Sequence, residues 1–405
     1  MDTRKRGLRS APPKGHEYAT KKDVAGRRSF PPCPPLPAKV NRRMNMSLFQ
    51  RKSPAKPVSF NHQMNLSPLY DPDKDPCYFD QIFVKESVIG EGSFGVVFKV
   101  KSEQDGKFYA VKQLKSSHAS HYGYAEVENY EKIGEHNNCV KFIMAWEELK
   151  IVHIQMEYCD LSLAQYAALT HKIGESQLWE ILYDMLKALD YLHSKNLIHL
   201  DVKPGNIMMS QGFYKLADFG LLVDLNKHDG KKISTISDGD AKYLACEVLD
   251  GIYTYSCDIF GLGISLLELA TNIELPEFGP LWHQIRKQYL PASFYDGVTK
   301  SFAVTIEKMM AKIHWQRPQA SKLLKNTHLK KIQKQDSKQP RNVYYEELPR
   351  EPCIVLYKNN NNNVETPPKS NEKIHDNLSC GSSCRDSHER ISPNRRLLCR
   401  GKLAF

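Results

Sequence analysis

Apolar and polar positions alternate along the middle of this chain in a way that predicts short strands first and helices later. A turn signal precedes residues 108–112, which have the composition of a strand, and residues 151–159 read as a buried strand that runs into a less regular segment. Between them, residues 124–135 read as a helix. The longest apolar stretch, residues 260–270, is interrupted by one glutamate. The pattern predicts a chain that contains both strands and helices.

Polar residues suited to phosphoryl transfer follow these strands. Residues 199–206 read His-Leu-Asp-Val-Lys-Pro-Gly-Asn, and an apolar run then leads to Asp218-Phe219-Gly220. Phosphoryl transfer needs one carboxylate to orient the attacking hydroxyl, and an amide and a second carboxylate to hold the Mg²⁺ ions that bridge the ATP phosphates. Asp201 supplies the first group, and Asn206 and Asp218 supply the metal ligands. In this order and spacing they resemble the catalytic core of a protein kinase.

A glycine-rich segment lies upstream and has the form G-x-G-x-x-G-x-V. In kinases this loop covers the ATP phosphates, which backbone can approach closely where no Cβ atom intervenes. A dinucleotide-binding turn shares the glycines but would open a helix, whereas a strand ending in Lys112 follows here. The expected ATP-binding residues of the loop are Ile89, Gly90, Glu91, Gly92, Ser93, Phe94, Gly95, Val96 and Val97.

Two basic residues are expected to act on the phosphates. Lys112 should hold the α- and β-phosphates and pair with a glutamate of the following helix. Of the three glutamates there, we expect Glu126 to form the pair, and Glu128 and Glu131 to lie in solvent. Lys203, two residues after Asp201, should neutralise charge on the transferred phosphate.

The adenine site is expected at residues 157–160, interpreted as the hinge between two lobes. Met156 should lie at the back of this site, a position that is compatible with a second role as a core residue. Backbone groups from Glu157 to Cys159 should contact the adenine edge.

Three residues of the large lobe match structural positions of kinases. Ala245-Cys246-Glu247 stands where kinases carry Ala-Pro-Glu, and Asp258 and Arg317 follow at the expected distances. By this resemblance Glu247 and Arg317 form a buried ion pair, and Asp258 ties the catalytic loop to a central helix. Cys246 replaces the usual proline and is not interpreted as a reactive thiol.

Composition places the kinase-like domain between two tails. The domain covers residues 83–330, with the small lobe at 83–156 and the large lobe at 161–330. Met1 to Tyr70 carry 15 Lys and Arg against 3 Asp and Glu, a net charge of +12, whereas the whole chain has +11. Residues 1–80 are proline-containing and poor in large apolar side chains, so we expect them to be disordered.

The C-terminal residues 331–405 are also expected to be disordered, because they contain an asparagine run and clusters of Ser, Lys and Glu. Residues 395–398 and 402–405 have the basic-x-leucine form of peptides that dock on cyclins, a pattern that is also common by chance. The basic N-terminal tail is accompanied by no nucleic-acid-binding motif, so no nucleic acid partner is expected.

Cysteine usage and hydropathy bear on the compartment. The ten cysteines have no spacing typical of disulfides or zinc, and no apolar segment follows the basic N-terminus, which favours a reducing intracellular location. The longest apolar stretch falls short of the roughly twenty residues that a membrane-spanning helix needs. We therefore expect no transmembrane segment.

The motifs together resemble the Wee/Myt family of cell-cycle inhibitory kinases, and more closely its Myt branch of membrane-associated tyrosine- and threonine-specific kinases. The resemblance implies an α+β, bilobal kinase fold with a small β-rich lobe and a larger helical lobe. It also implies use of ATP and Mg²⁺, and phosphorylation of an adjacent threonine and tyrosine in the glycine-rich loop of the mitotic cyclin-dependent kinase. That reaction inhibits the cyclin-dependent kinase and restrains entry into mitosis or meiosis. The expected partners are the cyclin-dependent kinase and its cyclin, and the enzyme itself is expected to be a monomer. The residues that carry the resemblance are 199–204, 218–225, 272–276, Trp282, 285–286 and 290–291.

Three departures keep alternatives open. Lys203 follows the serine/threonine-kinase pattern, so tyrosine specificity comes only from the resemblance. Leu200 replaces an arginine that captures a phosphorylated activation loop in many kinases, which suggests independence from phosphates at Ser234, Thr235 and Ser237. Vertebrate Myt kinases carry a membrane segment after the catalytic domain, whereas no such segment is expected here. This chain is therefore expected in the cytoplasm or nucleus, or peripherally on ER or Golgi membranes. The alternatives are a Wee-branch nuclear tyrosine kinase, a serine/threonine kinase with another substrate, and a scaffold that inhibits by binding the cyclin complex.

Overall fold

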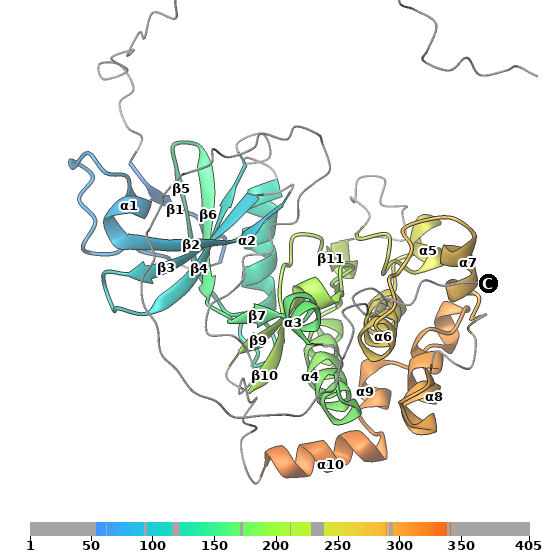
Figure 1. The fold of residues 1–405 in the computed structure, drawn as a ribbon. Helices are drawn as coiled ribbons and strands as arrows, with labels where there is room; N and C mark the ends of the chain where they lie inside the picture. The colour runs from blue at the N-terminus through green and yellow to red at the C-terminus, as the bar shows by residue number, and fades with distance from the viewer. Residues whose placement is uncertain are drawn as a thin grey trace, which may run out of the picture. The chain divides into compact units, whose positions relative to one another are not determined.

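The chain folds into a β-sheet lobe followed by a helical lobe, as Figure 1 shows. The fold expected from the sequence, α+β with two lobes, is confirmed. The computed structural model describes residues 54–61, 63–92, 95–115, 122–170, 173–210, 212–227, 239–288, 290, 295–337 and 341.

Six antiparallel strands build the small lobe, in the order β1-β5-β6-β4-β3-β2. Val97 on β3 and Ile154 on β6 lie directly opposite Lys112, so Lys112 sits in the middle of the sheet with a neighbour on each side. One helix, α2 (Tyr122–Ile133), packs against β5 and β6 (Figure 1). The strands are β1 (Lys56–Pro57), β2 (Phe83–Glu91), β3 (Gly95–Ser102), β4 (Phe108–Leu114), β5 (Phe142–Glu148) and β6 (Ile151–Glu157).

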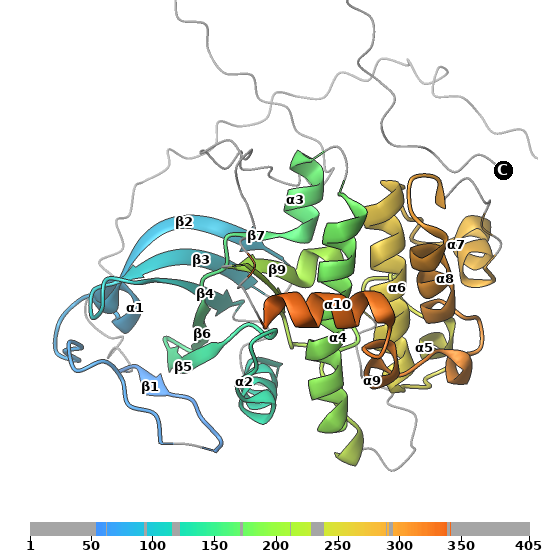
Figure 2. The same ribbon diagram turned by 90° about the horizontal axis from the view of Figure 1, so that it is seen from below.

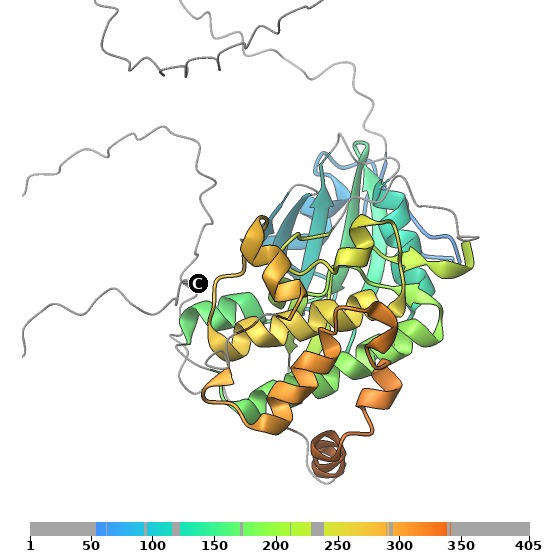
Figure 3. The same ribbon diagram turned by 90° about the vertical axis from the view of Figure 1, so that its right-hand side faces the viewer.

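Helices dominate the large lobe, and Figure 3 shows them on one side of the small-lobe sheet. α4 and α6 pack against each other in its core, and α10 contacts α4 (Figure 2). The helices are α3 (Leu163–Leu169), α4 (Glu175–Ser194), α5 (Cys246–Leu249), α6 (Tyr255–Thr271), α7 (Pro280–Arg286), α8 (Lys300–Met309), α9 (Ala320–Leu323) and α10 (Thr327–Asp336). Short strands β7 (Leu161–Ser162), β9 (Ile207–Ser210) and β10 (Phe213–Leu216) form one sheet, and β8 (Leu197–Ile198) pairs with β11 (Val223–Asp224).

Helix α6 contains the apolar stretch that the sequence singled out. Its residues from Cys257 to Leu267 are all buried, as is Leu269, as expected for a helix segment that is hydrophobic around its whole circumference. Glu268, which interrupts the stretch, accepts a hydrogen bond of 2.6 Å from the hydroxyl of Tyr243. Among the described residues, no helix is both long enough and apolar enough to cross a bilayer.

The ordered structure starts before residue 80, which corrects part of the expected N-terminal tail. β1 pairs with β5, and α1 (Tyr78–Ile82) buries Tyr78 and Phe79 against Trp146, with ring centroids 5.0 and 6.1 Å from that of Trp146. Ala55 belongs to the same buried cluster. Averaging composition from Met1 onward concealed these residues, because the prolines and basic residues of the first 50 positions outweigh a few well-placed aromatic side chains.

The ordered structure also continues past residue 330, where the sequence placed the end of the domain. α10 extends to Asp336, and Arg341 follows as a described residue. The guanidinium of Arg341 donates to Asp184 over 2.7 Å and to Asp336 over 2.9 Å. Asp184 is fully buried on α4, so its charge needs a cationic partner, and Arg341 supplies one.

Candidate active site

The catalytic loop, residues 199–206, connects β8 to β9 and is fastened to α6 through one carboxylate. The backbone amides of His199 and Leu200 donate to Asp258 over 2.9 and 2.8 Å. Leu200 adopts a left-handed backbone conformation with φ of 65°, which is unfavourable for a residue with a Cβ atom. The bond to Asp258 holds it there, and the Asp258 contact expected from the sequence is present.

Asp201 lies at the centre of a dense set of donors. The side-chain amide of Asn206 donates to Asp201 Oδ2 over 2.8 Å and to the Asp201 carbonyl over 2.9 Å. Lys203 Nζ lies 2.9 Å from the same Oδ2. The Asp240 amide donates to the other oxygen, Oδ1, over 3.2 Å. Both oxygens of this buried carboxylate are therefore oriented before any substrate binds.

Lys112 joins the two lobes through a pair of carboxylates. Its Nζ lies 2.7 and 3.0 Å from the two oxygens of Glu126 on α2, and 3.2 Å from Asp218 Oδ1. Burial lowers the pKa of Lys112, but both carboxylates raise it, and the resulting pKa lies above the usual value. Burial raises the pKa of Asp218, but Lys112 lowers it below the usual range. Both groups are therefore charged at neutral pH.

The other two glutamates of α2 are not simply solvated, contrary to the expectation from the sequence. Glu128 forms ion pairs with Lys132 at 3.2 Å and Lys227 at 2.8 Å. Glu131 accepts hydrogen bonds from the Ser59 hydroxyl and from the backbone amides of residues 60 and 61. The Glu128–Lys132 pair lies within α2 at a spacing of four residues, whereas Lys227 and residues 59–61 are distant in sequence and could not be found from the helical pattern.

The Asp218-Phe219-Gly220 segment is packed beneath α2. Phe219 is fully buried, its ring meets Tyr130 edge-on at 5.2 Å, and its carbonyl accepts a 2.9 Å hydrogen bond from Asn129. Asp218 itself has φ of 62°, a strained conformation that functional sites often retain. With Phe219 in this position the carboxylate of Asp218 is presented to Lys112, which is the arrangement that phosphoryl transfer requires.

The glycine-rich loop is a hairpin between β2 and β3. Gly90 pairs with Val97 and Glu91 with Val96, while Ser93 and Phe94 at the tip lie outside the described residues. A Cβ atom on Gly95 would lie 2.4 Å from the Gln113 carbonyl, so this glycine is required by the approach of β4. A Cβ atom on Gly92 would have no neighbour within 4 Å, and the Gly92 amide donates to the Gly95 carbonyl over 2.9 Å, which closes the base of the loop.

The hinge residues are arranged around β6 and Lys141. Met156 is buried on β6, where its sulfur accepts a hydrogen bond from Tyr130. The amide of Glu157 donates to the Lys141 carbonyl over 2.9 Å, so it is not free to bind adenine. Among the described residues the amide of Cys159 donates to no backbone carbonyl. Burial raises the pKa of the Cys159 thiol to about 12, which makes it unreactive.

The segment from residue 239 to 247 connects the catalytic loop to the large lobe. Arg317 Nη2 lies 3.0 Å from Glu247 Oε2, and both side chains are buried, as the sequence led us to expect. Asp240 lies close to the reaction centre but was missed by the sequence reasoning. Its carboxylate lies 3.7 Å from Lys203 Nζ, in addition to the contact of its amide with Asp201. Only its position a few residues before Ala245-Cys246-Glu247 was a signal.

The oxygen ligands of the site fit Mg²⁺ bound together with phosphates. Asn206 uses its amide nitrogen on Asp201, which leaves the amide oxygen available, and Asp218 offers a carboxylate. Mg²⁺ prefers such hard oxygen ligands and is usually held by one or two protein groups together with phosphates. In the described part of the chain, no group of three or more His, Cys, Asp or Glu side chains forms a separate metal site.

Comparison with known proteins identifies the family. The sequence model of the protein kinase domain matches residues 83–339. A membrane-associated tyrosine- and threonine-specific cdc2-inhibitory kinase of Drosophila melanogaster is 40% identical over 263 residues, 64% of this chain and 49% of that protein. The kinase wee-1.3 of Caenorhabditis briggsae, of the same description, is 40% identical over 65% of this chain and 40% of its own length.

A third relative, wee-1.1 of Caenorhabditis elegans, carries the same description and is 34% identical over 79% of this chain and 70% of its own length. The chain spans less than half the length of the first two relatives. The matched region contains every residue of the candidate site and both lobes apart from β1 and α1. The chain therefore belongs to the protein kinase family, within the Wee/Myt group of cdc2-inhibitory kinases.

Proposed function

We propose that this protein is an ATP-dependent kinase that phosphorylates an adjacent threonine and tyrosine in the glycine-rich loop of the mitotic cyclin-dependent kinase. The observation that carries the proposal is Lys112, which contacts Glu126 and Asp218 at once, beside an oriented Asp201. A scaffold without chemistry would have no need of this costly cluster of buried charges. The substrate is inferred from the names of the relatives, which describe cdc2-inhibitory kinases specific for tyrosine and threonine.

In this proposal each charged residue has one task. Asp201 accepts the proton of the substrate hydroxyl, and its two oriented oxygens keep the acceptor in place. Lys112 aligns the α- and β-phosphates, and Lys203 balances charge on the transferred phosphate. Asn206 and Asp218 would hold Mg²⁺, which when bound with ATP neutralises charge on the phosphates. Cys159 and the carbonyl of Glu157 would bind adenine.

The binding surfaces for ATP are assigned as the sequence predicts. Residues 89–97 would cover the phosphates, with the tip residues Ser93 and Phe94 outside the described part. Met156 would close the back of the adenine site, where Tyr130 holds its side chain.

We infer that the activation loop works without phosphorylation. Leu200 is buried and cannot bind a phosphate. Instead, the amide of Asp240 connects the segment directly to Asp201. The loop serines and threonine at 234, 235 and 237 lie outside the described residues. Replacement of all three by alanine should leave turnover within about twofold, measured on protein expressed with a phosphatase. Loss of nearly all turnover would refute this inference.

The names of the relatives also suggest partners and a location. We propose a monomer that binds the target kinase and its cyclin, located in the cytoplasm or nucleus or attached peripherally to ER or Golgi membranes; the last option is in keeping with relatives named membrane-associated. The cyclin-docking interpretation of residues 395–398 and 402–405 concerns positions outside the described residues. Fractionation at low and high salt tests the attachment, because a charge-held protein leaves the membrane as salt rises.

The decisive experiment incubates the protein and ATP with a catalytically inactive cyclin-dependent kinase and its cyclin, followed by mass spectrometry of the target. Phosphate on both the threonine and the tyrosine is the expected result. Phosphate on tyrosine alone would favour the Wee branch. Asp201→Asn is the control, because it preserves the shape of the side chain while removing the proton acceptor. If Asp201→Asn phosphorylated the target at the normal rate, the proposed role of Asp201 would be wrong.

A further inference from the structure

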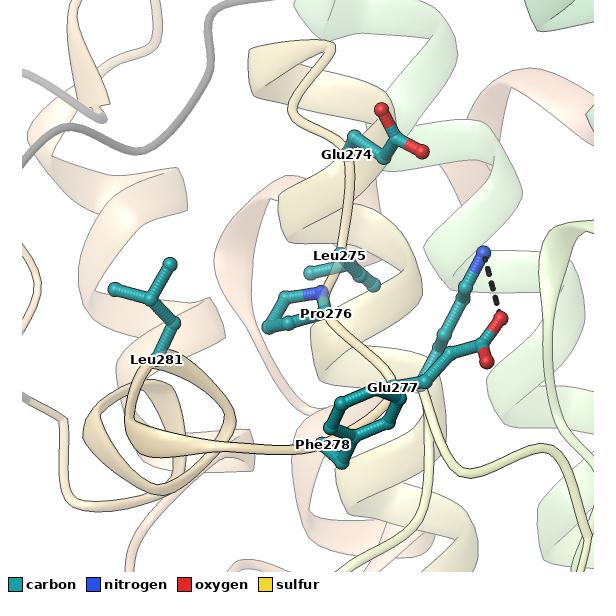
Figure 4. Close-up of a pocket in the computed structure, with 7 residues that line it drawn as sticks. Glu274, Leu275, Pro276, Glu277, Phe278 and Leu281 are labelled. Atoms are coloured by element: carbon teal, nitrogen blue, oxygen red, sulfur yellow. Dashed lines mark ion pairs between the residues drawn. The ribbon is translucent and has the colours of Figure 1, made fainter. Parts of the chain in front are cut away.

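The segment that joins α6 to α7 carries residues typical of the family, yet it takes no part in the proposed phosphoryl transfer. In the structure it borders a pocket of about 410 Å³. Residues 274–278 and Leu281 form most of the lining, and Lys242 reaches it from the neighbouring segment. Figure 4 shows Leu281, at the start of α7, standing across the pocket from Pro276 and Phe278.

Phe278 places an exposed aromatic side chain at the rim of this pocket. Its side chain is 83% exposed, the largest fraction among the exposed large apolar residues of the described part. It lies beside the apolar groups of Pro276 and Leu281, so it extends an apolar surface into solvent. An exposed aromatic residue next to a pocket is typical of protein–protein contacts, where such residues supply much of the binding energy.

The charges at the rim favour a cationic partner. Lys242 lies 3.5 Å from Glu277, so these two charges balance each other (Figure 4). Glu274 is exposed, and within the described ranges it forms no ion pair. The surface therefore offers one unbalanced negative charge next to apolar side chains, which complements a basic residue with an apolar neighbour.

Helix α7 is fixed rigidly to the segment that contacts the candidate active site. The indole of Trp282 donates to the Ala241 carbonyl over 2.8 Å. Arg286, only 2% exposed, donates to the carbonyls of Ala241, Lys242 and Leu244 at 3.0, 3.0 and 2.8 Å. A guanidinium used in this way holds α7, which contributes Leu281 to the pocket, and residues 241–244 together as one unit.

This unit lies next to the reaction centre along the chain. Lys242, in the pocket wall, follows Asp240 by two residues, and the Asp240 amide contacts Asp201. A protein held at the pocket would therefore be held in a fixed relation to Asp201. Such a second contact raises the effective concentration of the acceptor loop at the site.

We propose that this pocket docks the folded protein substrate through an apolar side chain beside Phe278 and a basic side chain beside Glu274. The proposal rests on the proposed function, because it concerns the substrate of that reaction. A folded acceptor needs such a contact more than a peptide does, since a short loop of a folded protein offers few groups to the active site. A peptide should reach Asp201 without using the pocket.

The test measures the steady-state kinetics of each variant with two substrates. One is the inactive cyclin-dependent kinase with its cyclin, and the other is a short peptide carrying the same threonine–tyrosine pair. Phe278→Ala and Phe278→Asp should raise KM for the folded substrate about tenfold. With the peptide as substrate, both kcat and KM should be unchanged. Trp315→Ala serves as the matched control, because Trp315 is also an aromatic residue, 73% exposed, on another segment.

Glu274→Lys tests the charge. It should lower kcat/KM for the folded substrate about threefold at low salt, and the loss should diminish as salt screens the charge. Equal loss on peptide and folded substrate would show damage to the fold and overturn the proposal. Unchanged kinetics on the folded substrate would also overturn it, and would leave a small molecule as the occupant.

The wild-type protein separates this proposal from the one on which it rests. If the wild type leaves the folded target unphosphorylated, the proposed function is wrong and docking of that substrate is wrong with it. If the wild type phosphorylates the target and the Phe278 variants do so equally well, the proposed function stands and the docking proposal alone fails.

Discussion

The close approach of residues 239–240 to the catalytic loop makes Gly239→Ala the sharpest test of the site. A Cβ atom on Gly239 would lie 2.7 Å from the Leu200 carbonyl oxygen and 3.3 Å from Asp201 Oδ1. Ordinary carbon–oxygen contacts start at about 3.3 Å, so the two segments must separate by roughly half an ångström. The catalytic loop cannot yield easily, because Asp258 holds the Leu200 amide at 2.8 Å. Residues 239–240 must therefore move.

That movement should break the hydrogen bond from the Asp240 amide to Asp201. A hydrogen bond to a charged group contributes about 1.5–3 kcal/mol, so kcat should fall by about 10- to 100-fold if the bond orients the proton acceptor. KM for ATP should change little, since Lys112 and the glycine-rich loop are untouched. Stability should fall by about 1–3 kcal/mol from overpacking.

The assay is steady-state phosphorylation of a peptide, with denaturant unfolding measured in parallel. Gly205→Ala is the matched control, because a Cβ atom there would lie 3.9 Å from its nearest neighbour, a side-chain carbon of Lys203. A Gly239→Ala protein with kcat within twofold of the wild type would refute the idea that this approach orients Asp201.

Three further predictions concern buried ionisable side chains. Glu126→Gln should lower kcat/KM for ATP at least tenfold, because Lys112 loses one of its two carboxylates, whereas Glu128→Gln, on the same helix but paired with Lys132 and Lys227, should change it less than twofold in the same assay. Arg286→Met should lower the free energy of unfolding by about 3 kcal/mol, measured with urea, since three carbonyls of residues 241–244 lose their donor; a loss below about 1 kcal/mol would contradict its anchoring role. Burial lowers the pKa of His153 to about 4, so the unfolded state binds the extra proton first as pH falls. Stability should therefore decline from about pH 6.5 to about pH 4 by up to about 3 kcal/mol, and His153→Phe should flatten this slope in urea titrations.

The residues that carry chemistry were predictable because their spacing is imposed by the reaction. Asp201, Asn206 and Asp218 stand at distances in sequence that the phosphates dictate, and the pair of Lys112 with Glu126 follows from the same constraint. The sequence also contained Asp240, but a single acidic residue in a loop has no distinguishing pattern. Its importance arises from the tertiary contact with Asp201, which is visible only in the structure.

The small-lobe boundary was harder to predict for a different reason. Tyr78 and Phe79 are only two aromatic residues after a long polar segment, and their partner Trp146 is almost 70 positions away. The three contacts of Glu131 with residues 59–61 are likewise long-range. Local sequence patterns indicate the period of a helix or strand, but they do not identify the distant residues that pack against it.

The aromatic cluster of α1 bears on how this kinase can be divided. The match to the kinase domain begins at residue 83, but the physical domain does not. A fragment starting at residue 83 would uncover Trp146, which is fully buried in the whole chain, together with Phe83. Such a fragment would contain every proposed catalytic residue and still be prone to aggregate. We therefore expect a stable fragment of this chain to include β1 and α1, which lie outside the region that defines the family.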